Sequence, residues 1–140
     1  MVDDVGFGLL LDRQQCLALL RTASLGRVIF THRAMPAVRP VRFTVVDEAV
    51  VFAVPTGSPL YAGARDAVVA FEADDFAADF GAGWYVSILG RATEPAVDDT
   101  EVACLCPCPS PAGRRFLRIP VEAVTGHRIA CHADVTPRNQ

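Results

Sequence analysis

Lysine is absent from this chain, and all 13 of its basic residues are arginines. A GC-rich genome accounts for that bias without any functional reason. Acidic residues outnumber basic ones, and the formal net charge is −3. This balance argues against a nucleic-acid backbone as the main partner, because such proteins carry an excess of positive charge.

Long apolar runs and a basic amino-terminal segment are also missing. No stretch approaches the roughly 20 apolar residues that a membrane span needs. Asp3 and Asp4 stand where a targeting segment would carry positive charge. We therefore expect a cytoplasmic protein with no membrane partner. The five cysteines are an odd number, and we expect them to be reduced in that compartment.

The length and composition indicate one globular domain. A chain of 140 residues suits a single core, which we place at about residues 11–130, with a loose carboxy-terminal tail. Hydrophobic residues make up 51% and charged residues 21% of the chain. This apolar surplus predicts a covered face at an oligomer interface.

The most informative segment covers residues 25–60. It contains three β-rich runs with short turn-forming breaks between them, which is typical of an antiparallel meander. The second break holds Asp47 and Glu48, a turn-forming pair. The runs are residues 25–30, 39–44 and 50–54.

A small-residue turn at residues 56–60 follows the third run and leads into a short helix at residues 59–65. Free backbone N–H groups at a helix start attract anions. Arg39 and Arg42 lie on the neighbouring strand and would add positive charge to the same place. The arrangement suggests a pocket for a phosphorylated ligand.

Further elements complete the predicted fold. Asp12 and Gln15 form a capping box that opens the first helix. Pro36 and Pro40 bracket the second strand, and Pro40 should lie at an edge or face a ligand, where its missing N–H is harmless. We predict a mainly β fold with short helices, a six-stranded antiparallel Greek-key barrel. Its last three strands are residues 67–72, 84–94 and 115–119, and a helix starts at residues 98–103.

Two segments invite a metal-binding interpretation. The predicted loop at residues 74–83 contains three aspartates, which we interpret as a solvated surface. Cys104, Cys106 and Cys108 lie close enough to share an ion, but their alternating spacing differs from the two-residue gap of common zinc sites. We predict no metal.

The order of these elements resembles the pyridoxamine 5′-phosphate oxidase-like family of flavin-binding split barrels. The resemblance implies flavin mononucleotide (FMN) as cofactor, a homodimer that shares the flavin site, and an oxidoreductase acting on an unidentified small molecule. No catalytic side-chain constellation is visible, which fits a family whose flavin carries the chemistry. The similar segments are residues 25–60, 68–72, 83–92, 115–119 and 124–129.

The resemblance also implies positions for the cofactor. Arg39 would contact the phosphate with the turn after the third strand, and the backbone of Val41 and Phe43 would lie against the flavin ring. Arg39 and Arg42 differ by three positions, so they point to opposite faces of one strand. The implied cofactor-binding residues are Arg39, Val41, Arg42, Phe43, Thr56, Ser58, Trp84 and Tyr85.

One position departs from the family pattern. Relatives often carry a lysine directed at the phosphate after the serine or threonine of the turn, whereas this chain has Pro59. Two alternatives therefore stay open, a deazaflavin-dependent reductase and a cofactor-free binding or structural protein. Trp84 is also open to two interpretations, a core residue or a wall of the flavin site.

Overall fold

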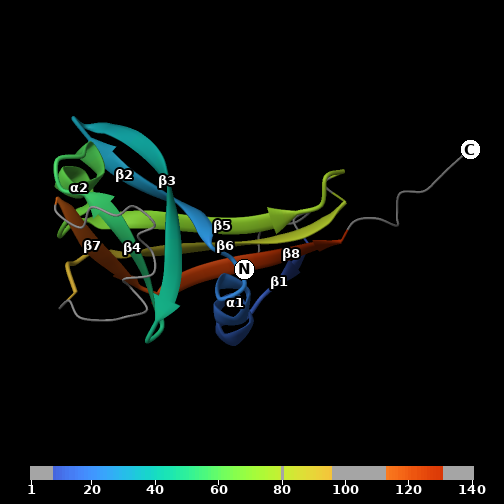
Figure 1. Cartoon of the computed structure of the whole chain (residues 1–140). Helices are drawn as coiled ribbons and strands as arrows, with labels where there is room; N and C mark the ends of the chain where they lie inside the picture. Colours follow the sequence, from blue (N-terminus) through green and yellow to red (C-terminus); the bar gives the residue numbers. More distant parts are fainter. Residues whose placement is uncertain (1–7, 80, 96–112, 131–140) are drawn as a thin grey trace, which may run out of the picture.

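The computed structural model describes residues 8–79, 81–95 and 113–130. The predicted helix start at residues 98–103, the three-cysteine segment and the tail after His132 lie outside them. Figure 1 shows the strands curving around one core, with α1 and α2 on different sides. The elements are β1 (Leu9–Leu10), α1 (Arg13–Leu20), β2 (Leu25–His32), β3 (Met35–Val46), β4 (Ala49–Pro55), α2 (Pro59–Ala64), β5 (Val68–Phe76), β6 (Ala82–Arg91), β7 (Arg114–Pro120) and β8 (Ala123–Ala130).

The described strands form one antiparallel sheet in the order β1-β8-β6-β5-β2-β3-β4-β7. The mainly β antiparallel fold with short helices is confirmed, but the predicted count of six strands is too low by two. β8 contains Gly126, His127 and Arg128, which interrupt the alternation that marks a strand in sequence. Its pairing with β6 along residues 82–89 holds it in the sheet, and β1 then pairs with β8.

The sheet closes into a barrel only in part. Thr93 and Arg118 exchange backbone hydrogen bonds of 3.0 and 2.7 Å, which join the end of β6 to β7. β3 and β4 pair only through residues 43–46 of β3, although both strands continue further. Residues 35–42 of β3 pair with β2, whereas β4 continues to pair with β7. β3 and β4 therefore separate on the amino-terminal side of Phe43.

Two tight hairpin turns define β3. Asp47 and Glu48 have φ of 52° and 58°, and Arg33 and Ala34 have 55° and 63°. Two consecutive residues with positive φ form the turn whose twist matches paired strands. The predicted turn at Asp47 and Glu48 is confirmed. The turn-forming break predicted between residues 30 and 39 is narrower than expected, because the turn uses only Arg33 and Ala34 and β3 already begins at Met35.

Both prolines of this region lie inside β3 and do not bracket it. The N–H of Phe43 donates to the Ser24 carbonyl at 3.0 Å, so the odd-numbered residues of β3 bond to β2. Pro36 and Pro40 are even-numbered, and their nitrogens therefore point to the opposite edge. The expectation that Pro40 lies at an edge is confirmed, and the same geometry explains how a strand tolerates Pro36.

α1 begins and packs as its sequence predicts. Asp12 and Gln15 form the capping box in both directions, with bonds of 2.8 and 2.9 Å. Cys16, Leu17 and Leu20 are buried on one face of the helix. A Cβ atom on Gly126 of β8 would lie 2.6 Å from the Cys16 sulfur, so the absence of a side chain there lets α1 approach the sheet.

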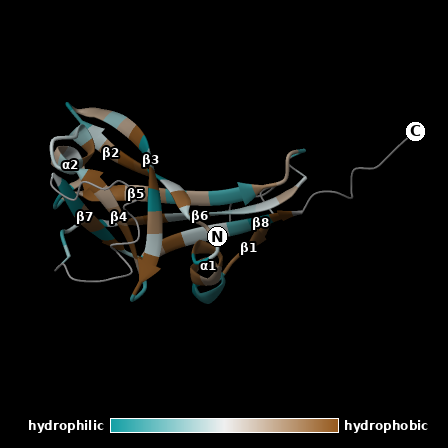
Figure 2. Cartoon of the chain, in the orientation of Figure 1, coloured by the Kyte–Doolittle hydropathy of each residue, from teal (hydrophilic) through white to brown (hydrophobic). Residues whose placement is uncertain are grey.

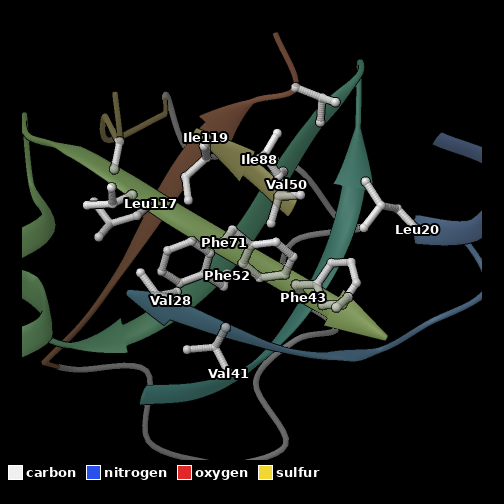
Figure 3. Packing of buried hydrophobic residues seen from close by; sticks show 14 of the residues in the cluster. Leu20, Val28, Val41, Phe43, Val50, Phe52, Phe71, Ile88, Leu117 and Ile119 are labelled. Carbon is white, nitrogen blue, oxygen red and sulfur yellow. The ribbon is translucent and has the colours of Figure 1, made fainter. Parts of the chain in front are cut away.

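The core lies between the curved strands and receives large side chains from most of them. Phe43 and Phe71 meet edge to face, with ring centroids 4.9 Å apart. Figure 3 shows these rings beside Phe52, with the aliphatic side chains of β2, β4, β6 and β7 around them. The inner face of the barrel is therefore filled by side chains, and a ligand must bind at its edges or on its outer surface.

Candidate functional site

The candidate site is the place where β3 leaves β4. Residues 35–42 of β3 pair with β2 on one edge, and on their other edge they do not pair with β4. Arg39 is exposed there, on the same side of β3 as the buried Val41 and Phe43. Its Nη1 donates to the Val38 carbonyl at 3.0 Å, and its guanidinium lies 5.9 Å from the Phe30 ring centroid.

The backbone groups of Val41 and Phe43, which we expected against a flavin ring, point toward β2. The Phe43 N–H bonds to Ser24, and by alternation the Val41 groups also point to β2. The even-numbered residues face the open edge, which gives it the N–H and carbonyl groups of Val38 and Arg42 and the carbonyls of Pro36 and Pro40. The proposed backbone contact of Val41 and Phe43 with a flavin ring stays a prediction, although their polar groups do not face that edge.

The turn after β4 is held by a short network. The Thr56 N–H donates to the Gly113 carbonyl at 2.6 Å. The Ser58 hydroxyl donates to the Pro55 carbonyl at 2.8 Å and accepts from the Tyr61 N–H at 3.2 Å, so it caps α2. Pro59 starts that helix, where its missing N–H costs nothing. Ser58 is therefore engaged in the fold, whereas no described residue bonds to the Thr56 hydroxyl.

A charged cluster that the sequence did not reveal lies beside this turn. The Tyr61 hydroxyl donates to Glu94 at 3.0 Å and accepts from Arg65 at 3.0 Å, while Arg115 bonds to the other Glu94 oxygen at 2.9 Å. The hydrogen bond from Arg115 is the main reason that the pKa of Glu94 is lowered. The cluster links α2 to β7, and its members are too far apart in sequence for spacing to connect them.

Trp84 and Tyr85 lie on β6, three strands away from β3 in the sheet. Strands are about 4.8 Å apart, so these residues are roughly 14 Å from β3 along the sheet. Trp84 is 7% exposed and belongs to the core, which favours the first of its two interpretations. Tyr85 points to the opposite face, with its ring 5.3 Å from His127. One chain therefore does not bring them to the Arg39 edge.

The outer face of the sheet carries a second group of charges. Arg27 of β2 bonds to Glu72 of β5 at 2.6 Å, and the same nitrogen lies 3.4 Å from Asp74. The predicted loop at residues 74–83 is wrong at its start, because Asp74 and Asp75 lie inside β5 and pair with Tyr85 and Trp84. Figure 2 shows the hydrophilic end of that strand. The pairing compensates for aspartate's low strand propensity.

The residues at the open edge fit a phosphate group. Arg39 offers an exposed guanidinium, which matches phosphate geometry, and Thr56 offers a hydroxyl in the turn after β4. No cluster of three or more metal-ligating side chains occurs within residues 8–79, 81–95 and 113–130. In the same ranges no helix is long and apolar enough to cross a membrane.

Comparison with known proteins defines the class of this split barrel. A family model described as pyridoxamine 5′-phosphate oxidase matches residues 12–128, and the chain belongs to the pyridoxamine 5′-phosphate oxidase-like family. An uncharacterized protein of Mycobacterium tuberculosis, Rv0080, is 38% identical over 128 residues, covering 85% of this chain and 84% of the relative.

Solved structures agree with the fold. The FAD binding protein from Mycobacterium smegmatis superposes with a TM-score of 0.74 and 28% identity, covering 86% of this chain and 98% of that one. A putative pyridoxamine 5′-phosphate oxidase from Corynebacterium glutamicum gives a TM-score of 0.68 and 26% identity, covering 86% and 97%. The split barrel of these structures is thus the architecture of this chain.

Proposed function

We propose that this protein binds a flavin nucleotide, FMN, and acts as an oxidoreductase on a small molecule. The observation that carries the proposal is the open edge of β3 at residues 35–42, which does not pair with β4 and carries the exposed Arg39. The similarity to the FAD binding protein of M. smegmatis supports a flavin and makes FAD the nearest competitor. The reaction, its substrate and a cytoplasmic location are parts of the same proposal.

The side chains of the site have distinct tasks in this proposal. Arg39 and the Thr56 hydroxyl hold the phosphate, and the edge of β3 orients the rest of the nucleotide. Pro40 presents no N–H to that edge, so the backbone donors there are the N–H groups of Val38 and Arg42. The flavin would supply the electron and hydride transfer chemistry, while the protein positions it and excludes competing reactions.

We also propose a homodimer, because the outer face of the sheet has an apolar row across five strands. Each member pairs with the next in the ladder, so the row is continuous and lies on the side away from the core. Val38 is 51% and Leu89 56% exposed. The outer apolar row consists of Val38, Ile29, Ala70, Leu89 and Ala123.

A second copy of this chain is the partner that this surface suits. In a twofold interface the same patch meets itself, and a row of aliphatic side chains is complementary to its own copy. A specific interface buries roughly 1,000 Å² or more of surface. The buried area would reach this value only if residues beside the row also take part. Such a dimer would bring β6 of one copy, with Tyr85, toward a site of the other.

Binding of FMN, FAD and riboflavin tests the cofactor assignment. We expect Arg39→Ala to weaken FMN binding far more than riboflavin binding, by about 10-fold or more, because only FMN has a phosphate. Isothermal titration of each ligand measures this. Arg21→Ala is the matched control, since Arg21 is an exposed arginine at the end of α1. Equal losses for FMN and riboflavin would contradict phosphate binding by Arg39.

Two alternatives have a specific observation in their favour. Pro59 replaces the expected lysine at the start of α2, and the Ser58 hydroxyl is engaged as its cap. The first feature removes a positive charge and the second engages a hydroxyl, so the turn has fewer groups that could bind a phosphate. Binding of a deazaflavin without binding of FMN or FAD would favour the deazaflavin-dependent reductase. Failure of all three ligands to bind the folded protein would favour a cofactor-free binding or structural protein.

A further inference from the structure

The charged cluster beside α2 brings two guanidinium groups to one carboxylate and one aromatic ring. Arg115 donates to one Glu94 oxygen at 2.9 Å, and Arg65 lies 3.9 Å from the other. The guanidinium carbons lie 5.0 Å (Arg65) and 5.6 Å (Arg115) from the Tyr61 ring centroid. Like charges repel at such distances, so an anion between them is favoured, and Glu94 already supplies one.

The two arginines are held in place by the fold itself. The Tyr61 hydroxyl accepts a hydrogen bond from Arg65 and donates one to Glu94, both at 3.0 Å. The hydrogen bond from Arg115, and after it the one from Tyr61, lowers the pKa of Glu94 against the effect of burial, so the carboxylate is ionised at neutral pH. Because these contacts already order the side chains, a ligand loses less binding free energy to ordering them.

Both guanidinium groups are also within reach of a ligand from solvent. The Arg65 and Arg115 side chains are 49% and 50% exposed, and their bonds within the cluster are made through the Nη1 atoms. A guanidinium presents five N–H donors in a planar fork that matches the oxygens of a phosphate group. The exposed sides of two arginines that meet at the same carboxylate can therefore bind one phosphate together.

α2 separates this cluster from the edge of β3. A Cβ atom on Gly63 would lie 2.9 Å from the Phe30 ring, so that side of α2 rests on β2. Arg39 of β3 lies over the same Phe30 ring. Tyr61 is two positions before Gly63, which is roughly 200° around a helix. A helix with its side chains is about 10–12 Å wide, so the cluster and Arg39 are two separate places.

We propose that Arg65 and Arg115 form a second anion site, which binds the phosphate group of a phosphorylated small molecule or inorganic phosphate. A phosphate suits the site better than a carboxylate does, because it carries more negative charge and has three acceptor oxygens that can bond both guanidinium groups. Glu94 orients Arg115 and limits the affinity, since its carboxylate repels the incoming anion. The second anion site does not depend on the flavin that we propose at Arg39.

A titration with inorganic phosphate, followed by the backbone amide NMR signals, tests the site. At constant ionic strength set with chloride, we expect saturable shifts at Arg65 and Arg115 with a Kd of about 1 mM, which two charge-assisted hydrogen bonds support. Arg115→Gln should increase the Kd by about tenfold or more. Arg65→Gln should do the same and serves as the second variant if Arg115→Gln loses the fold. Arg21→Gln is the matched control, at an exposed arginine on the end of α1.

Glu94→Gln separates a binding site from a contact that only stabilises the fold. Glutamine keeps an acceptor oxygen for Tyr61 and Arg115 but removes the negative charge, so phosphate should bind about two- to fivefold more tightly. Glu94→Gln and Arg115→Gln break the same ion pair, and thermal unfolding without phosphate should show a small loss of stability in both. Their phosphate affinities should change in opposite directions, which a purely structural contact does not explain.

Two further ligands identify the source of the phosphate. Phenyl phosphate should give the same shifts if the site accepts phosphate esters, whereas shifts with inorganic phosphate alone would assign the site to the free ion. One equivalent of FMN should leave phosphate binding at the cluster unchanged. Loss of the phosphate shifts with FMN would overturn the second anion site, because the flavin phosphate would then occupy the cluster.

Two other results would overturn the second anion site. One is the absence of saturable shifts at the cluster in both the parent protein and Glu94→Gln. The other is an unchanged Kd in both Arg65→Gln and Arg115→Gln. A protein that binds phosphate at the cluster but binds no flavin would contradict only the proposed function.

Discussion

The two faces of the strands β2, β5 and β6 differ although they share one hydrogen-bond register. On the inner face Val28, Phe71 and Ile88 pair across the strands, and each is 0% exposed. The next position on each strand contributes Arg27, Glu72 and Ser87 to the outer face. A slip of one residue would exchange these sets and bury the charges, so the inner face fixes the register.

The comparison separates two roles within one sheet. The inner residues determine which strands pair and in which register, and they tolerate little change in volume. The outer residues carry the charges and the outer apolar row, which contribute less to folding of the single chain. Substitutions on the two faces should therefore have effects of different size and on different measurements.

The largest expected effect comes from truncating the inner face at its centre. Phe71→Ala should destabilise the fold by about 3–5 kcal/mol, because it removes a fully buried ring and leaves a cavity beside Phe43. Gly26 lies against the same ring, since a Cβ there would come within 2.3 Å of it. Urea unfolding measures the change in the free energy of unfolding.

Val68→Ala is the control on the outer side of the same strand, where the side chain is 62% exposed. It should change the stability of the single chain by no more than about 0.5 kcal/mol. Similar losses for Phe71→Ala and Val68→Ala would remove the distinction between the two faces.

A smaller effect is expected where α1 covers the inner face of β8. Gly126→Ala places a Cβ 2.6 Å from the Cys16 sulfur and should cost about 1–3 kcal/mol by overpacking. Cys16→Ala should recover part of that loss in the double variant, because the sulfur is the nearest atom. Gly57→Ala is the control, with no atom within 4 Å of the added Cβ. Additive losses in the double variant would show that the strain lies elsewhere.

Local sequence signals predicted the elements that depend on neighbouring residues. The capping box at Asp12, the turn at Asp47 and Glu48, and the start of α2 at Pro59 each follow from chemistry within a few positions. The position of Pro40 at an edge of β3 also followed from its missing N–H. These features are local, so the sequence alone contains the information that specifies them.

Features that depend on register could not be predicted in this way. The pairing of Arg27 with Glu72 spans 45 positions and exists only because β2 lies beside β5. The direction of the Val41 and Phe43 backbone depends on a bond from Phe43 to Ser24. β8 was not counted because Gly126 and His127 interrupt its pattern, and only its ladder with β6 makes it a strand.

The smallest expected effect on folding belongs to the outer apolar row. Leu89 is 56% exposed, so Leu89→Ser should change the unfolding free energy of the monomeric chain by no more than about 0.5 kcal/mol. The dimer should respond more strongly, because burying a leucine side chain contributes about 1.5–3 kcal/mol and both copies lose it. We expect the dimer Kd, measured by sedimentation, to increase by at least about tenfold.

Met35→Ser is the matched control for this prediction. Met35 is 66% exposed, but its odd-numbered position on β3 places it on the side opposite Val38 and outside the outer apolar row. It should leave the Kd unchanged. If Met35→Ser weakened the dimer as much as Leu89→Ser, association would depend on general exposed hydrophobicity and not on this face. If Leu89→Ser unfolded the monomer, the outer face would contribute to folding as the inner face does.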